Sequence, residues 1–149
     1  VVRGGVPVAG VVYNPMLDQL YKARAGGGAF RNDAAIHVGA CHGLTDCAML
    51  GDRGMLGAPP WPQMRVETRN SVAYRVVLVA DGSFDATISL SAKRDWDLAA
   101  ADIILREAGG RITDRRGEPL RYNGPEALQA SMVAAGPVLH DEILQRVRQ

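Results

Sequence analysis

The sequence predicts an α/β layered sandwich, an α+β arrangement of sheets and helices in a single domain over residues 1–149. Three observations support this class. The chain opens with short β-rich runs separated by turn residues, its second half alternates helical and strand patterns, and its length suffices for one sizeable core. No internal repeat, low-complexity segment or interdomain linker divides the sequence.

The opening segment is predicted to form hairpins. A β-rich run over Val6–Tyr13 is broken by Asn14–Pro15, and a returning strand over Leu20–Arg24 ends at the glycines at 26–28. Because no Lys-Ser or Lys-Thr follows these glycines, they predict a tight turn rather than a phosphate loop. A third extended piece contains Phe30, a turn at Asn32–Asp33, and the alternating residues Ile36 and Val38.

The middle of the chain contains a short strand, a loop and an ambiguous apolar segment. We expect a short buried strand over Cys47–Gly51 and a proline-containing loop over Asp52–Arg65. The run Val76–Val79 fits a buried strand, but Ser71 is a suitable N-cap and Gly82 a suitable stop, so we predict a helix up to Ala80. The residues on one face of that helix are Val72, Val76, Val79 and Ala80.

The second half continues the alternation. Phe84–Leu90 alternates apolar and polar residues, which predicts a strand with one apolar face. A helix follows, with apolar residues at helical spacing from Leu98 to Ala108 and with Gly109 or Gly110 at its end. The remaining elements are a strand at Arg111–Thr113, a turn at 115–117, a strand at Ser131–Ala135, and a helix opening at Gly136–Pro137 with the apolar stripe Leu139, Ile143, Leu144 and Val147.

Composition excludes several classes of partner. The net charge is +1, which gives no reason to expect a nucleic acid or a membrane surface as partner. No apolar run approaches the roughly 20 residues of a membrane helix. The chain begins with Val1-Val2 and shows no signal peptide, so we expect a cytoplasmic protein from which an N-terminal segment is missing. The spacing of Cys41 and Cys47 does not fit a zinc site, which predicts reduced thiols.

Asp97 is the first candidate for a functional residue. It is expected just before a helix, where one carboxylate oxygen caps backbone N–H groups and the other is free to face outward. Metal and phosphate sites are built at such strand-to-helix junctions. A plain N-cap explains the same residue type, and the two roles are compatible because a carboxylate has two oxygens.

Longer motifs in this chain resemble a known family. Trp96-Asp97-Leu98-Ala99-Ala100-Ala101 followed by Glu107-Ala108-Gly109-Gly110 is similar to the C-terminal signature of the inositol monophosphatase superfamily of Mg²⁺-dependent phosphatases. The resemblance continues from Gly10-Val11-Val12-Tyr13-Asn14-Pro15 to the final helix. It implies the fold of these sugar phosphatases, Asp97 as a ligand of Mg²⁺, and a small phosphorylated molecule as substrate. Members are usually dimers, which implies a possible homodimer.

The resemblance also implies substrate contacts. Ser71 and the backbone of Val72 correspond to residues that hold the substrate in the family, and a hydroxyl with free N–H groups at a helix start suits a phosphate ester. Helix capping alone explains Ser71 equally well. Members that bind inositol carry a glutamate six residues before the Trp, whereas this chain has Leu90 there.

The basic residues favour a more anionic substrate. The segments around Ser71 and Lys93 look more like those of bacterial 3′(2′),5′-bisphosphate nucleotidases, and Lys93 or Arg75 is placed to pair with a second phosphate. Solvated surface charge explains both residues as well. Inositol or sugar phosphates are therefore an alternative substrate class.

The family's N-terminal half has no counterpart in this sequence. That half carries a Gly-Glu-Glu segment and an Asp-Pro-Xaa-Asp-Gly-Thr motif, which supply most metal ligands, and Asp81-Gly82-Ser83 is only a superficial echo of the second. We therefore expect residues 1–149 to be the C-terminal portion of a longer phosphatase. A catalytically incomplete fragment that binds a ligand or partner is the alternative from a different class.

Overall fold

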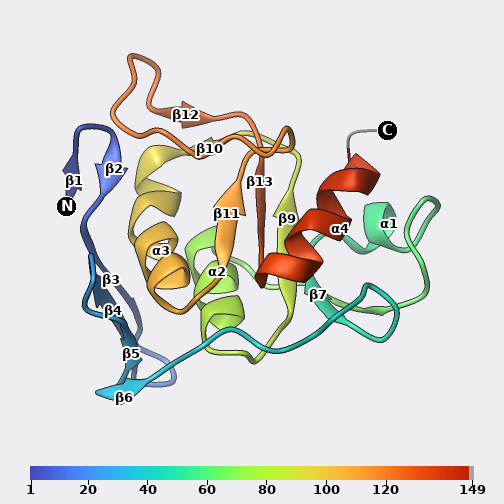
Figure 1. Cartoon of the computed structure of the whole chain (residues 1–149), viewed down its shortest axis with the longest axis horizontal. Coiled ribbons are helices and arrows are strands. Elements are labelled where there is room, and N and C mark those ends of the chain that lie inside the picture. The colour runs from blue at the N-terminus through green and yellow to red at the C-terminus, as the bar shows by residue number, and fades with distance from the viewer. Residues whose placement is uncertain (148–149) are drawn as a thin grey trace.

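The computed structural model describes residues 1–147 and shows stacked layers of sheet, helices, sheet and helices (Figure 1). This arrangement confirms the predicted α+β layered sandwich. The larger helices α2 and α3 lie between the two main sheets, and α4 covers the outer face of the second. The helices are α1 (Arg53–Leu56), α2 (Val72–Ala80), α3 (Asp95–Glu107) and α4 (Pro137–Val147).

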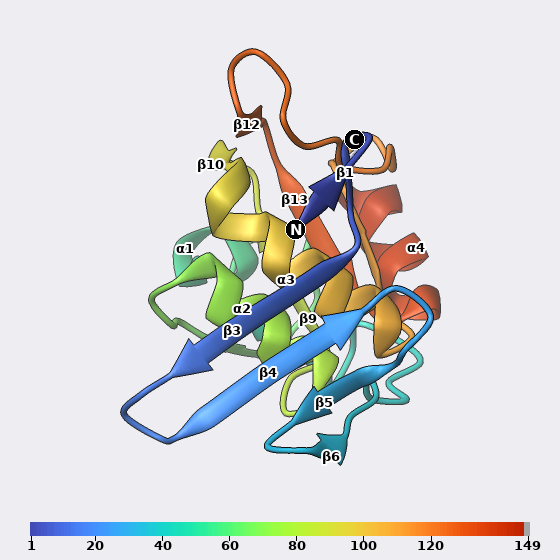
Figure 2. The same cartoon turned by 90° about the vertical axis from the view of Figure 1, so that its left-hand side faces the viewer.

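The first main sheet is antiparallel and lies against α3. Its strands, in spatial order, are β3 (Ala9–Asn14), β4 (Gln19–Arg24), β5 (Ala29–Arg31) and β6 (Ala34–Ala35). In Figure 2 these strands lie in front of the helices, with their outer face toward the viewer. Gly10 allows the close approach, because a Cβ there would lie 2.7 Å from the Cα of Ala100. The predicted extension to Ile36 and Val38 is wrong, since β6 ends at Ala35.

The predicted strand Val6–Tyr13 is split in two. β1 (Val2–Arg3) and β2 (Val6–Pro7) form a small hairpin, and β3 begins after Val8. The N–H groups of Val8 and Ala9 both point at the carbonyl oxygen of Val1, at 2.9 and 3.5 Å. Two residues facing one is the pattern of a β-bulge, which bends the strand at this point.

The second main sheet is mixed and fully buried at its centre. Its order is β11 (Arg111–Thr113), β13 (Met132–Ala135), β9 (Ala86–Ser89), β7 (Ala48–Leu50) and β8 (Arg65–Glu67). The β7 strand runs parallel to both of its neighbours, and the other pairs are antiparallel. All residues of β9 are buried, so the expectation of a single apolar face is wrong. The strand contacts α2 on one face, while its neighbour β13 contacts α4 on the other.

The ambiguous apolar segment is a helix, as predicted. Ser71 caps α2 by accepting a hydrogen bond from the N–H of Tyr74 at 3.3 Å. Its valines are buried against the central sheet and α3, so the continuous apolar run reflects burial on several sides.

Helix α3 begins earlier than expected and ends as expected. It starts at Asp95 rather than at Leu98. At its end Gly109 adopts a φ of +88°, and the N–H of Gly110 donates to the carbonyl of Leu105 at 2.9 Å. These are the features of a Schellman-type C-cap, for which glycine is the preferred residue.

Two regions contain structure that the sequence did not indicate. The expected loop over Asp52–Arg65 contains α1, and its last residue begins β8. The strands β10 (Lys93–Arg94) and β12 (Leu128–Gln129) pair antiparallel beside the start of α3. Cys41 and Cys47 are free thiols, as predicted. Within residues 1–147 no helix is both long and apolar enough to cross a membrane.

Candidate functional site

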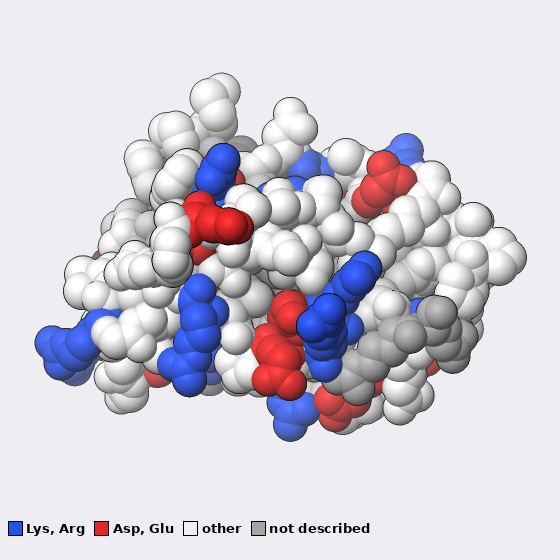
Figure 3. Space-filling view, turned by 90° about the horizontal axis from the view of Figure 1, so that it is seen from above, with Lys and Arg blue, Asp and Glu red and all other residues white. Residues whose placement is uncertain are grey.

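The side of the molecule on which α3 begins carries charges of both signs. Figure 3 shows Lys and Arg side chains interspersed with Asp and Glu rather than gathered in one patch. Recognition of an anion on this side therefore depends on individual side chains and helix ends, not on a broad positive field.

Asp97 is the third residue of α3, not the residue before it. The N-cap is Arg94, so the expected N-cap position of Asp97 is wrong. Its carboxylate nevertheless turns back toward the helix start, and Oδ2 accepts a hydrogen bond from the N–H of Arg94 at 3.3 Å. No donor of the described chain forms a hydrogen bond with Oδ1. A half-buried carboxylate at the positive end of the helix dipole thus keeps one oxygen for a cation or a water molecule.

Asp95 lies two residues before Asp97 but has a structural role. It is 6% exposed and uses both of its oxygens inside the chain. Oδ2 accepts the N–H of Asn123 and Oδ1 accepts the side-chain amide of Gln129, each at 2.7 Å. Asp95 therefore holds Asn123 and Gln129 against the start of α3, and both of its oxygens already accept hydrogen bonds from the chain.

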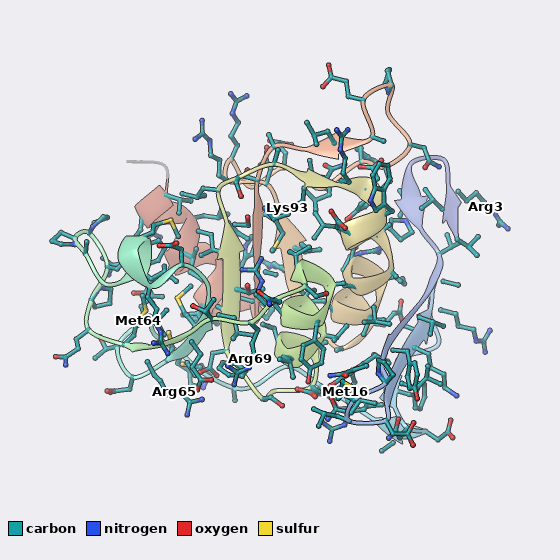
Figure 4. The ribbon with its side chains drawn as sticks, turned by 180° about the vertical axis from the view of Figure 1, so that it is seen from behind. Arg3, Met16, Met64, Arg65, Arg69 and Lys93 are labelled. Carbon is teal, nitrogen blue, oxygen red and sulfur yellow. The ribbon has the colours of Figure 1, made fainter. Side chains whose placement is uncertain are left out.

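Lys93 is the first residue of β10, directly before α3 (Figure 4). Its ammonium donates to the carbonyl and hydroxyl oxygens of Ser91, at 3.2 and 2.6 Å, and to the carbonyl of Ala92 at 3.3 Å. These contacts hold the ammonium of Lys93 against the two residues that precede it. The predicted contact of Lys93 with phosphate stays a prediction, and a substrate phosphate would have to compete with these local acceptors.

Ser71 and Val72 lie at the start of α2. Ser71 is exposed and has a φ of +63°, an uncommon conformation for a residue with a side chain. Ser71 lines a hollow of about 240 Å³ together with Tyr74 and with residues 12–15 at the end of β3. Val72 is buried, so only its backbone is available to a ligand. The substrate-binding roles of both residues stay predictions.

Arg75 is one helical turn beyond Ser71, and no acidic side chain of residues 1–147 forms an ion pair with it. Its Nε is buried, and no acceptor within the described part of the chain forms a hydrogen bond with it. Burial alone lowers the pKa of Arg75 from its ordinary value, with no opposing contribution from a carboxylate. The predicted role of Arg75 as the partner of a substrate phosphate stays a prediction.

Helix packing brings the predicted residues onto one side of the molecule without joining them. α2 and α3 pack against each other and begin toward the same side (Figure 1). Ser71 and Asp97 share no hydrogen bond. Among residues 1–147 no group of three or more His, Cys, Asp or Glu side chains is arranged to hold a metal ion. Mg²⁺ prefers six oxygen ligands with several from carboxylates and water, so Asp97 alone does not form a complete site.

The structure also contains a polar cluster that the sequence did not reveal. Asp81, whose side chain is 1% exposed, accepts hydrogen bonds from Arg31 at 2.7 Å and from the hydroxyl of Tyr21 at 2.8 Å. Burial, followed by the hydrogen bond to Asp81, raises the pKa of Tyr21. Asp81 therefore connects the end of α2 to the first sheet, which agrees with its motif being only a superficial echo of a metal motif.

Comparison with known proteins places these features in a family. A model of the inositol monophosphatase family matches residues 1–149. The chain is 35% identical to the inositol-1-monophosphatase of Mesorhizobium japonicum, over 97% of this chain and 54% of that protein. It is 34% identical to the 3′(2′),5′-bisphosphate nucleotidase CysQ of Aggregatibacter actinomycetemcomitans, over 85% of this chain and 51% of that protein.

The fold agrees with the sequence relationship. A crystal structure of staphylococcal IMPase-II superposes with a TM-score of 0.82 at 27% identity, over 97% of this chain and 57% of that one. The chain spans about half the length of the curated relatives it matches. The match to the family model over the whole sequence, together with these relatives, shows that the chain belongs to the inositol monophosphatase family.

Proposed function

We propose that this chain is the C-terminal portion of a Mg²⁺-dependent phosphomonoesterase, in which Asp97 is one ligand of the metal. The observation that carries the proposal is the free Oδ1 of Asp97 at the start of α3, directly after Trp96. Relatives over nearly the whole chain are named as phosphatases, which supports the reaction class.

The remaining ligands have to come from polypeptide beyond these residues, because the described chain offers no cluster of three metal-binding side chains. When bound, Mg²⁺ polarises the phosphoryl oxygens and activates water. This chain contributes the orientation of one carboxylate, fixed by Arg94 N–H, and the helix start that stabilises negative charge. The alternative hypothesis is that the chain on its own is a catalytically incomplete fragment.

We further propose adenosine 3′,5′-bisphosphate as the substrate. Such a molecule carries two phosphates, one at the reacting centre and one that requires a separate cationic partner. Arg75 is a candidate partner of this kind, because no carboxylate among residues 1–147 pairs with its guanidinium. Lys93 is a second candidate, although its ammonium is held by Ser91. Ser71 and the backbone of Val72 would contact the substrate at the start of α2.

Inositol or sugar monophosphates are the second candidate substrate class. The relative from Mesorhizobium japonicum is named as an inositol-1-monophosphatase and covers 97% of this chain. These substrates carry a single phosphate, so they give Arg75 no anionic partner. Comparing phosphate release from adenosine 3′,5′-bisphosphate with release from inositol monophosphate distinguishes the two candidates.

The metal role is tested by Asp97→Asn in the chain joined to the N-terminal half of its natural protein. Loss of one charged ligand should reduce Mg²⁺-dependent phosphate release by at least about a hundredfold. Asp33→Asn is the matched control, because Asp33 is an exposed acid paired with Lys22 on the first sheet. Unchanged turnover of the Asp97→Asn protein would refute the assignment.

A further inference from the structure

The segment 121–129 contacts the residues around the start of α3. In Figure 1 its strand β12 lies beside β10, directly before that helix. The two strands pair antiparallel, with Arg94 opposite Leu128. The guanidinium of Arg94 also donates to the carbonyl of Glu126 at 3.2 Å. The entry into α3 is therefore held by a part of the chain that lies about thirty residues further on.

Asp95 forms most of the contacts between this segment and the helix. Its N–H donates to the carbonyl of Ala127 at 3.0 Å, and its carboxylate accepts the N–H of Asn123 and the side-chain amide of Gln129. Asn123 and Ala127 have φ values of +64° and +47°, which are uncommon for residues with a side chain. Such conformations persist only where surrounding contacts fix them. The segment thus adopts unfavourable backbone conformations at the two residues whose main chain contacts Asp95.

The side chain of Gln129 is suited to its position because it supplies two donors. Its Nε2 donates to Oδ1 of Asp95 and to the carbonyl of Arg121, each at 2.7 Å. A side-chain amide nitrogen carries two hydrogens, so both are used. A carboxylate at this position would face two acceptors, and an apolar side chain would remove a donor from the buried carboxylate of Asp95. The residue type at position 129 therefore determines whether Asp95 keeps both of its partners.

The same helix turn sets the orientation of Asp97. Oδ2 of Asp97 accepts the N–H of Arg94 at 3.3 Å, which is long for such a bond. Arg94 lies between the pairing with β12 and the residue that Gln129 holds, so the segment 121–129 determines where this N–H points. A small displacement of Arg94 would break the bond and allow the carboxylate of Asp97 to rotate.

We propose that Gln129 is a positioning residue for Asp97 and acts through Asp95. This inference rests on the proposed role of Asp97 as a ligand of Mg²⁺. Gln129 holds Asp95, Asp95 holds the first turn of α3, and that turn directs the carboxylate of Asp97. Groups that orient a metal ligand without touching the metal change metal affinity by about tenfold to a hundredfold when they are removed. Gln129 therefore affects the affinity for Mg²⁺ as well as the stability of the fold.

Two variants of Gln129 with nearly unchanged length test the proposal in the chain joined to the N-terminal half of its natural protein. Gln129→Met removes both donors and should raise the Kd for Mg²⁺, measured by titration calorimetry, by about tenfold. The value of kcat at saturating Mg²⁺ should change by less than about twofold, because the ligand itself is intact. Gln129→Glu places a carboxylate against Asp95 and should raise the Kd further. Circular dichroism melts show whether each variant folds.

Thr87→Val is the matched control for a loss of stability alone. The hydroxyl of Thr87 donates to the carbonyl of Leu50 at 2.8 Å inside the second sheet, so this variant also removes a buried hydrogen bond. It should lower the melting temperature and leave the Kd for Mg²⁺ unchanged. A double variant tests the route through Asp95. Once Asp95→Ala has removed the acceptor, adding Gln129→Met should raise the Kd by less than about twofold.

Amide hydrogen exchange in the metal-free protein gives a readout that does not depend on activity. The N–H of Arg94 should exchange at least about tenfold faster in Gln129→Met, whereas the N–H groups of α2 should not change. An unchanged Kd for Mg²⁺ in both Gln129 variants, or an equal rise of the Kd in Thr87→Val, would overturn the proposal. If Asp97→Asn leaves turnover unchanged, the proposed function fails. If Asp97→Asn abolishes turnover while the Gln129 variants keep their Mg²⁺ affinity, only the role of Gln129 fails.

Discussion

At the scale of single residues, the charged side chains of Arg75 and Glu107 differ in whether the chain provides them with hydrogen-bond partners. Arg75 has a buried Nε for which the described part of the chain provides no acceptor, and burial lowers the pKa of this side chain. Glu107, at the end of α3, accepts the N–H groups of Gly26 and Gly28, each at 2.9 Å. The glycine turn is therefore a small anion-binding loop occupied by a carboxylate of the same chain. Within residues 1–147 the Nε of Arg75 has no acceptor, whereas the carboxylate of Glu107 has two backbone donors.

Replacing Arg75 should raise stability and weaken substrate binding. Arg75→Met removes an unsatisfied buried donor and keeps the apolar stem, which should stabilise the fold by about 1 kcal/mol. In the complete phosphatase, KM for adenosine 3′,5′-bisphosphate should rise more than KM for inositol monophosphate. Urea unfolding and initial rates measure the two effects. Arg121→Met, at an exposed position, is the control, and equal changes in both KM values would contradict the role of Arg75.

The Glu107 contacts predict a pH dependence of stability. Hydrogen bonds from Gly26, and to a smaller extent from Gly28, lower the pKa of Glu107 below its ordinary value. A carboxylate with a lowered folded-state pKa stabilises the protein above its unfolded-state pKa, and this contribution is lost as pH falls through the folded-state value. Glu107→Gln should therefore flatten the acid side of a plot of unfolding free energy against pH. An unchanged slope would show that Glu107 contributes nothing there.

At the scale of elements, the contact of β3 with α3 depends on the absence of a side chain. A Cβ at Gly10 would lie 2.7 Å from both the Cα and the O of Ala100 and 2.9 Å from Cγ2 of Ile103. Because the two nearest of these atoms belong to the backbone of α3, little room is left for adjustment. The position of the first sheet relative to the helices is thus fixed at this crossing.

Gly10→Ala should cost about 2 kcal/mol of unfolding free energy, because the added methyl group forces β3 away from α3. Gly124→Ala is the matched control, since no atom lies within 4 Å of the Cβ that it would add. Denaturant unfolding of both variants checks the prediction. Equal stability of the two would mean that the strand moves aside at no cost.

At the scale of the whole molecule, the sequence indicated the elements with a clear period and missed those fixed by distant contacts. α2, α3 and the central strands follow from apolar spacing and capping residues. The true start of α3 depends on Asp95, whose partners Asn123 and Gln129 lie about thirty residues further on. No local pattern contains that information, and strands as short as β10 and β12 arise from the same tertiary contacts.

The candidate site was likewise only partly predictable from the sequence. Its residue types and the family were visible in the motif around Trp96 and Asp97, and the comparisons confirm the family. That the Nε of Arg75 has no acceptor among residues 1–147 depends on the tertiary surroundings of this side chain, which spacing in the sequence does not describe. The same holds for Asp95, which a motif places beside Asp97 but which the fold turns inward.

The hydrogen bonds that Asp95 accepts from Asn123 and Gln129 have a consequence for folding during synthesis. The ribosome delivers α3 before it delivers Asn123 and Gln129, so for that interval the carboxylate of Asp95 has no donors and its burial is unfavourable. The first turn of α3, which carries Asp97, is therefore expected to fold stably only after residues 123–129 have left the ribosome. Nascent chains arrested before residue 123 should be cut by protease at this turn, and chains arrested well after residue 129 should resist.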